Sequence, residues 1–213
     1  MKPEKIVDPI IYLITDGSLT DENFAGETGQ IFEILNAAIE ARVPMFQIRE
    51  KQLSAKHLFT LTSEAVKIAR GSETRIFVND RADIAAAACA DGVQLTEISL
   101  PPDVVRLSFP GLLLGVSTHS VGSVAAAARA GADFALFGPI FGTPGKLNMQ
   151  GLDKLRQACD AAVNFPVVAI GGIDGSNIRQ VFRAGASGFA SIRFLNSKEN
   201  LRAMSALIAE VQA

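Results

Sequence analysis

The sequence predicts a (β/α)8 TIM barrel, because short apolar runs alternate with amphipathic stretches of helical length along the whole chain. Glycine or proline residues mark many of the joints between them. The runs are apolar without alternation, which is typical of parallel strands buried on both faces. Eight units in 213 residues give about 27 residues each, near the short end for this fold. An open doubly wound sheet is the alternative architecture.

Each expected element follows from this pattern in order. The strands are expected at residues 11–16, 45–50, 75–80, 92–97, 112–119, 134–141, 166–173 and 188–195. The helices are expected near residues 27–42, 54–70, 81–90, 101–108, 120–131, 151–163, 174–185 and 197–212. We expect a single domain over residues 1–213, since no linker, charge run or low-complexity segment interrupts the alternation.

Composition excludes several classes of protein. The chain is 48% hydrophobic and 20% charged, which excludes wholesale disorder. A net charge of −2 argues against nonspecific electrostatic binding to nucleic acid or to an anionic membrane. The first apolar run, residues 10–14, is too short to span a bilayer, and we expect a cytoplasmic protein without a targeting segment. Cys89 and Cys159 have no metal-type spacing and are expected to be buried, reduced thiols.

Active sites of such barrels lie at the carboxyl ends of the strands, so polar residues there are the candidates. In the second run, alternation places Gln47, Arg49 and Lys51 on one face, directed into the barrel. Such donors would be costly to bury without an anionic partner, and a phosphate or diphosphate is a natural one. Alternatively, Lys51 lies in solvent and Arg49 pairs with Glu50 or another carboxylate.

The third and fifth runs end in further polar residues. Asn79 and Asp80 could cap the following helix, or Asp80 could offer a carboxylate to Mg²⁺. Beside the cationic second run, the active-site interpretation is favoured. Ser117 and His119 share a face of the fifth run, and His119 is a candidate acid, base or phosphate contact. A structural histidine is the alternative.

The last three runs end in loops suited to a second anion. Residues 137–146 form a loop rich in glycine and proline that carries Thr143 and Lys146. Gly171 and Gly172 end the seventh run, where backbone N–H groups can approach a phosphate closely. Arg193, after the eighth run, could add a charged contact. Together the runs predict two substrates, one with a diphosphate and one with a monophosphate.

Six motifs carry a resemblance to a known family: QIREK (47–51), ND (79–80), ADGVQL (90–95), GVSTHS (115–120), FGPIFGTPGK (137–146) and AIGGI (169–173). This set resembles the thiamin phosphate synthase family, together with its relative thiazole tautomerase. The resemblance implies a transferase of thiamin biosynthesis that uses Mg²⁺. Such an enzyme joins hydroxymethylpyrimidine diphosphate to a thiazole phosphate and releases diphosphate. Its residues neutralise the leaving group and position the partner.

The resemblance also implies roles for individual residues. Asp80 corresponds to a Mg²⁺ ligand and Ser117 to a contact near the pyrimidine. The pyrimidine diphosphate contacts correspond to Gln47, Arg49, Lys51, Asn79 and Lys146. The thiazole phosphate contacts correspond to Thr143, Gly172 and Ile192, with Gly171 and Arg193 as further binding candidates. The candidate catalytic residues are Arg49, Lys51, Ser117, His119 and Lys146.

Three positions depart from the family pattern. Ser99 stands where synthases carry a second Mg²⁺ carboxylate, so either the metal site is weakened or Glu97 substitutes for that ligand. Arg193 replaces a small serine, and Gly145 replaces a threonine. Two other functions therefore stay open: a metal-independent thiazole tautomerase with His119 as acid and base, and a non-catalytic barrel that binds a phosphate ligand. A homo-oligomer is compatible with the sequence.

Overall fold

The computed structural model describes residues 9–142 and 148–204 of the chain. Its eight parallel strands are hydrogen-bonded in chain order in a closed barrel, so the predicted (β/α)8 architecture is confirmed. Closure includes the hydrogen bond from the Ile10 amide to the Ser187 carbonyl oxygen, 2.9 Å. The open doubly wound sheet is therefore excluded.

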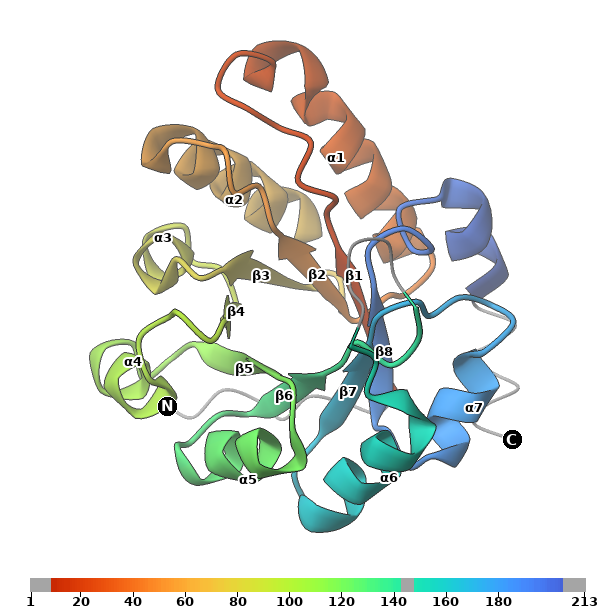
Figure 1. The fold of residues 1–213 in the computed structure, drawn as a ribbon. Helices are drawn as coiled ribbons and strands as arrows, with labels where there is room; N and C mark the ends of the chain where they lie inside the picture. Colours follow the sequence, from red (N-terminus) through yellow and green to blue (C-terminus); the bar gives the residue numbers. More distant parts are fainter. Residues whose placement is uncertain (1–8, 143–147, 205–213) are drawn as a thin grey trace. The chain divides into compact units, whose positions relative to one another are not determined.

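The strands alternate with helices along the chain (Figure 1). The strands are β1 (Ile10–Ile14), β2 (Met45–Ile48), β3 (Arg75–Asn79), β4 (Gly92–Leu95), β5 (Leu113–Thr118), β6 (Phe134–Phe137), β7 (Val167–Ile170) and β8 (Gly188–Ser191). The helices are α1 (Phe24–Glu40), α2 (Ala55–Ala69), α3 (Ala82–Ala87), α4 (Pro102–Ser108), α5 (Val121–Arg129), α6 (Gly151–Ala161) and α7 (Ile178–Arg183). Residues 198–204 are also helical.

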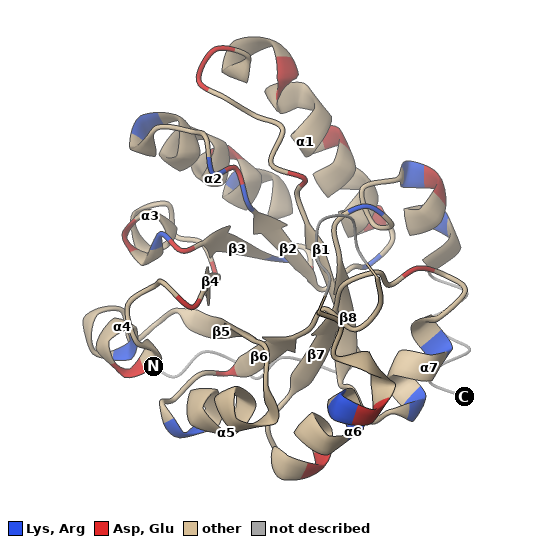
Figure 2. Cartoon of the chain, in the orientation of Figure 1, with Lys and Arg blue, Asp and Glu red and all other residues tan. Residues whose placement is uncertain are grey.

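The apolar runs became strands because both of their faces are covered. Every residue of β1, β2, β4, β6 and β8 is buried. Among the strand residues only Arg75 is charged, whereas the coloured charges in Figure 2 lie mainly on helices and loops. All eight expected strands are confirmed, but each ends one to four residues earlier than predicted because the residues after it already belong to a loop.

The helix at 174–185 was predicted too long. α7 begins only at Ile178, because residues 174–177 first form a hydrogen-bonded turn. In that turn the Asp174 amide donates to Asn177 Oδ1 at 3.0 Å, and the Ser176 amide donates to Asp174 Oδ1 at 2.9 Å. Short polar side chains of this kind compete with the helix for backbone groups.

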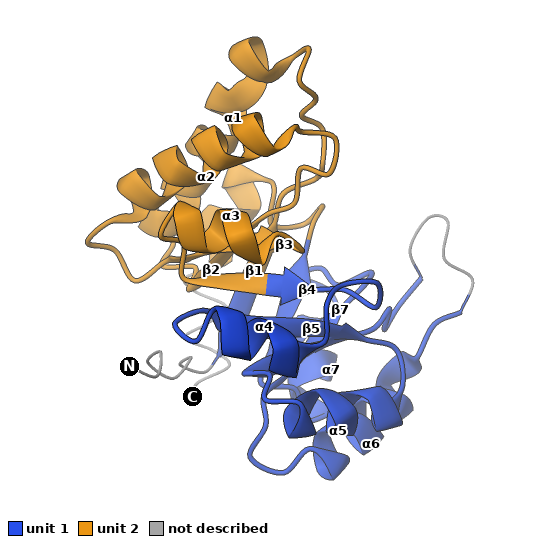
Figure 3. Cartoon of the chain, turned by 90° about the vertical axis from the view of Figure 1, so that its left-hand side faces the viewer, with its two compact units in different colours: residues 1–11, 94–191 blue, residues 12–93, 192–213 orange. Residues whose placement is uncertain are grey.

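The chain divides into two compact units, coloured separately in Figure 3. Unit 1 comprises residues 1–11 and 94–191, and unit 2 comprises residues 12–93 and 192–213. In unit 2, the register pairs Gln47 with Phe77 and Ile48 with Val78, so the ends of β2 and β3 are neighbours. In unit 1, β5 pairs with β6, β6 with β7 and β7 with β8, so the carboxyl ends of consecutive strands are neighbours there as well.

Two further sequence expectations can be compared with the structure. No helix in the described ranges is both long and apolar enough to cross a bilayer. Cys159 is half-buried, but Cys89 is exposed, so the expectation that both thiols are buried was wrong. Cys89 follows the short helix α3 with a positive φ of 57°, in the turn that leads to β4.

Candidate active site

The side-chain alternation predicted that the strand continues through the cationic segment after Ile48, but the structure shows a loop there. β2 ends at Ile48, so Arg49 and Lys51 lie in the following loop and the strand rule does not set their direction. Gln47 points into the core, where its Nε2 donates to Tyr12 Oη at 2.8 Å. Burial raises the pKa of Tyr12, so the phenol stays neutral there.

The structure also decides between the two interpretations of Arg49. Glu50 is not its partner, because both Glu50 oxygens accept backbone amides, from Gly17 at 3.2 Å and from Leu19 at 2.8 Å. Arg49 is half-buried, and within the described residues it has no ion pair. Lys51 is exposed, as the alternative interpretation expected. Unit 2 therefore presents two cations after β2.

Asn79 is the last residue of the neighbouring strand β3 and Asp80 directly follows it, and neither is the N-cap of a helix. The N-cap of α3 is Arg81, whose side chain makes no capping hydrogen bond. Asp80 has a positive φ of 64°, a conformation that Asp tolerates better than most residues. Arg81 pairs instead with Asp83, at 2.6 Å between Nη2 and Oδ2. The β2–β3 register thus sets an amide and a carboxylate beside the cationic segment of unit 2.

In unit 1, Ser117 is held by a buried glutamine that sequence analysis did not single out. Gln94, in the middle of β4, is 2% exposed, and its Nε2 donates to Ser117 Oγ at 3.2 Å. Within the described residues, Gln94 Oε1 has no hydrogen-bond partner. A buried polar atom without a partner costs about 1–3 kcal/mol of folding free energy. The signal of Gln94 in the sequence is a long polar side chain inside an otherwise apolar strand.

His119 directly follows β5 and has contacts on both ring nitrogens. Nδ1 contacts the Gly138 carbonyl oxygen, and Nε2 lies 3.9 Å from Glu97 Oε1. A carbonyl oxygen only accepts, so Nδ1 carries a proton in that contact. The next residue, Ser120, begins α5 with a capping box that it shares with Ser123. The imidazole is therefore anchored at one nitrogen and turned toward a carboxylate at the other.

The loop after β4 shows how the Ser99 departure is accommodated. Ser99 Oγ accepts the Thr96 amide at 2.7 Å and lies 3.0 Å from Thr96 Oγ1. This hydroxyl closes its own turn, so it does not replace a carboxylate as a metal ligand. In residues 9–142 and 148–204, no group of three or more His, Cys, Asp or Glu side chains could hold a metal ion. Mg²⁺ is commonly held by one or two carboxylates plus substrate phosphates, and Asp80 fits that limited requirement.

The glycine pair after β7 is fixed by backbone contacts within unit 1. The Phe141 amide donates to the Gly171 carbonyl oxygen at 2.9 Å, and Asn177 Nδ2 donates to the Gly172 carbonyl oxygen at 2.9 Å. Gly172 has a φ of +66°, and a Cβ there would lie 2.7 Å from the Gly142 oxygen. Only glycine fits without displacing the loop, and glycine is also what a close phosphate contact needs.

Of the remaining predicted residues, Ile192 and Arg193 are described by the structure, and two others are not. In unit 2, Asn196 Nδ2 donates to the carbonyl oxygens of Ile192, at 2.6 Å, and Ile14, at 2.7 Å, and these bonds fix the segment after β8. Arg193, in the same segment, is exposed. Thr143 and Lys146 lie outside the described residues.

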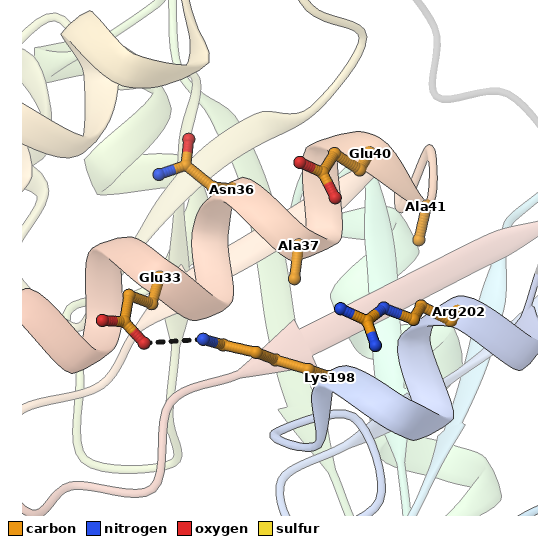
Figure 4. Close-up of a pocket in the computed structure, with 7 residues that line it drawn as sticks. All are labelled: Glu33, Asn36, Ala37, Glu40, Ala41, Lys198 and Arg202. Atoms are coloured by element: carbon orange, nitrogen blue, oxygen red, sulfur yellow. Dashed lines mark hydrogen bonds and ion pairs between the residues drawn. The ribbon is translucent and has the colours of Figure 1, made fainter.

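A separate pocket lies between α1 and the helical residues 198–204 (Figure 4). Lys198 Nζ pairs there with Glu33 Oε2 at 2.6 Å, and Glu40 and Arg202 supply one more charge of each sign. It contains none of the predicted site residues. Its balanced charges do not select an anion.

Comparison with known proteins identifies the family to which this chain belongs. The family described as thiamine monophosphate synthase matches residues 11–195. A thiamine-phosphate synthase of Chloroflexus aurantiacus is 35% identical over 214 residues, covering 97% of this chain and 96% of the relative. One from Roseiflexus castenholzii is also 35% identical, covering 96% and 88%.

A solved structure is similar as well. The thiamine phosphate pyrophosphorylase of Pyrococcus furiosus superimposes with a TM-score of 0.79 at 30% identity, covering 97% of this chain and 98% of that one. Sequence relatives and this structure thus match the barrel over nearly its whole length. The chain belongs to the thiamine monophosphate synthase family.

Proposed function

We propose that this protein is a thiamin phosphate synthase that couples hydroxymethylpyrimidine diphosphate to thiazole phosphate. In this reaction the bond between the pyrimidine methylene carbon and the diphosphate oxygen breaks, and the electron pair leaves with diphosphate. A bond then forms from the thiazole nitrogen to the same carbon. Family membership and the named relatives support this activity.

One observation carries the proposal: Glu50 binds backbone amides, which leaves the charge of neighbouring Arg49 available to a ligand. Arg49 and Lys51 are suited to neutralise the negative charge that grows on departing diphosphate. Asn79 and Asp80 stand at the end of the adjacent strand in the same unit. In unit 1, the Gly171–Gly172 backbone is suited to the monophosphate of the second substrate.

Magnesium is part of the proposal, with Asp80 as the protein carboxylate that would hold it together with diphosphate oxygens. When bound, Mg²⁺ would supply further charge neutralisation of the leaving group. Asp80→Asn is expected to raise the Mg²⁺ concentration needed for half-maximal rate. The measurement is a Mg²⁺ titration of the initial rate, and an unchanged midpoint would contradict this assignment.

The deciding experiment mixes purified protein with both substrates and Mg²⁺, and measures diphosphate release and thiamin phosphate formation. Stoichiometric appearance of both products supports the proposal. Binding of thiazole phosphate without any coupling under saturating conditions would overturn it and favour a non-catalytic binding protein.

Thiazole tautomerase activity is a second candidate, favoured by the geometry of His119. Its imidazole is anchored at Nδ1 and has Nε2 3.9 Å from the Glu97 carboxylate, an arrangement suited to proton transfer. This activity would be insensitive to chelators and would be lost in His119→Asn. Coupling that requires Mg²⁺ and survives in His119→Asn would argue against it.

A further inference from the structure

A buried carboxylate ties two loops of unit 2 together. Glu50 is 3% exposed, and its two oxygens accept the amides of Gly17 and Leu19 at 3.2 and 2.8 Å. These amides belong to the loop between β1 and α1, more than 30 residues earlier in the chain. A buried carboxylate is tolerated when hydrogen bonds satisfy its charge, and bonds to a charged acceptor are among the stronger ones. The loop after β2 therefore holds the loop after β1.

The same loop supports Arg49. The Arg49 amide donates to Thr15 Oγ1 at 2.8 Å. A Cβ placed on Gly17 would lie 3.3 Å from the Arg49 carbonyl oxygen and 3.5 Å from its Nη1, so the guanidinium lies against the Gly17 backbone. Glu50 binds the amide of that same glycine. Movement of residues 15–19 would consequently displace the Arg49 side chain.

We propose that Glu50 is a positioning residue for Arg49, one of the two cations assigned to diphosphate. Its carboxylate binds the amides of residues 17 and 19, and the backbone of Gly17 in turn supports the Arg49 guanidinium. Because the backbone amides satisfy Glu50, it does not neutralise Arg49, whose charge stays available to an anion. This inference rests on the proposed function, since it assigns the diphosphate to Arg49 and Lys51.

Glu50→Gln tests the proposal, because it keeps the shape of the side chain but turns one acceptor into a donor that opposes a backbone N–H. We expect the Kd for inorganic diphosphate with Mg²⁺, measured by calorimetry, to rise about 10- to 100-fold, as for a cation displaced by about 1 Å. The kcat/KM for coupling should fall by a similar factor. Affinity for thiazole phosphate should not change. Glu64→Gln, an exposed carboxylate on α2 paired with Lys67, is the matched control and should behave as wild type.

These readouts separate positioning from a loss of folded protein. An irreversibly misfolded fraction lowers the number of binding sites but leaves the Kd of the remaining sites unchanged, and a thermal unfolding curve shows whether reversible unfolding at the assay temperature contributes to the Kd. A folded Glu50→Gln protein that binds diphosphate as wild type does would overturn the inference. Failure of the wild type to bind diphosphate or to couple the substrates would instead overturn the proposed function.

A measurement on the wild type covers the case in which the variant does not fold. Hydrogen exchange of the Gly17 and Leu19 amides should slow when inorganic diphosphate and Mg²⁺ are added, because occupation of Arg49 stabilises the loop beneath it. If diphosphate binds but the exchange rates of these two amides do not change, the proposal is contradicted.

Discussion

Replacement of Gly172 by alanine perturbs the candidate phosphate loop in a way whose size follows from the structure. The residue has a φ of +66°, and left-handed backbone costs a non-glycine residue about 1–2 kcal/mol. The new Cβ would also lie 2.7 Å from the Gly142 oxygen and 2.8 Å from Phe141 Cβ. Overpacking of this kind adds about 1–3 kcal/mol. The expected destabilisation is therefore about 2–5 kcal/mol.

Gly131 provides a matched control in the same unit. Its φ is +82°, but a Cβ there would have no neighbouring atom within 4 Å. Gly131→Ala should therefore lose only the backbone contribution, about 1–2 kcal/mol. Thermal unfolding separates the two variants, since each kcal/mol shifts the Tm of a chain this size by about 2–4 °C.

Binding gives the second readout of this comparison. Gly172→Ala must displace the loop that offers backbone amides to the phosphate, so its affinity for thiazole phosphate should fall about tenfold or more, or at least 1.4 kcal/mol. Gly131→Ala should bind as wild type does. The reasoning is refuted if Gly172→Ala is no less stable than Gly131→Ala and retains full affinity in calorimetry.

Three other predictions concern single side chains. Lys51→Ala should lower kcat/KM for coupling about 100-fold or more, because it removes a positive charge that neutralises the leaving diphosphate. Lys67→Ala, on the surface of α2, should leave kcat/KM unchanged, and equal effects of the two substitutions in steady-state kinetics would contradict this role of Lys51. A backbone amide and an imidazole hold the pKa of Asp21 below its ordinary value of 3.8, so its stabilisation is present above that pH and is lost as the pH falls through the lowered pKa. The stability difference between wild type and Asp21→Asn should thus shrink as the pH of the unfolding titration falls through the lowered pKa of Asp21; a difference that persists at the acid end contradicts this. Burial, assisted by a nearby carboxylate, raises the pKa of Cys159 to about 11, so iodoacetamide at pH 8 should modify the exposed Cys89 first, as peptide mass analysis would reveal.

The position of each strand could be predicted because it depends on a local pattern. A run such as residues 134–137 is apolar on both faces, and such a run is stable only when both faces are covered. The same pattern predicted which loops follow the strands. The sequence therefore brought the cations at 49 and 51, the carboxylate at 80 and the glycine pair at 171–172 to the carboxyl ends of strands, although it extended several strands over residues that lie in loops.

Hydrogen bonds between distant segments could not be predicted in this way. The sequence left open whether Arg49 pairs with Glu50 or another carboxylate, and the structure shows that Glu50 instead binds amides more than 30 residues away. Ser117 was identified without Gln94, which lies 23 residues earlier in the chain and donates to it. Ser99 was recognised as a departure from the family, but only the structure shows that its hydroxyl closes its own turn.

The sequence by itself determined the order of the elements and which residue types reach the ends of the strands. The tertiary structure decided which of those polar groups are already satisfied by the protein and which are left for a ligand. The physical reason is that burial of apolar runs is encoded locally, whereas a buried charge is satisfied by whichever donors folding brings to it.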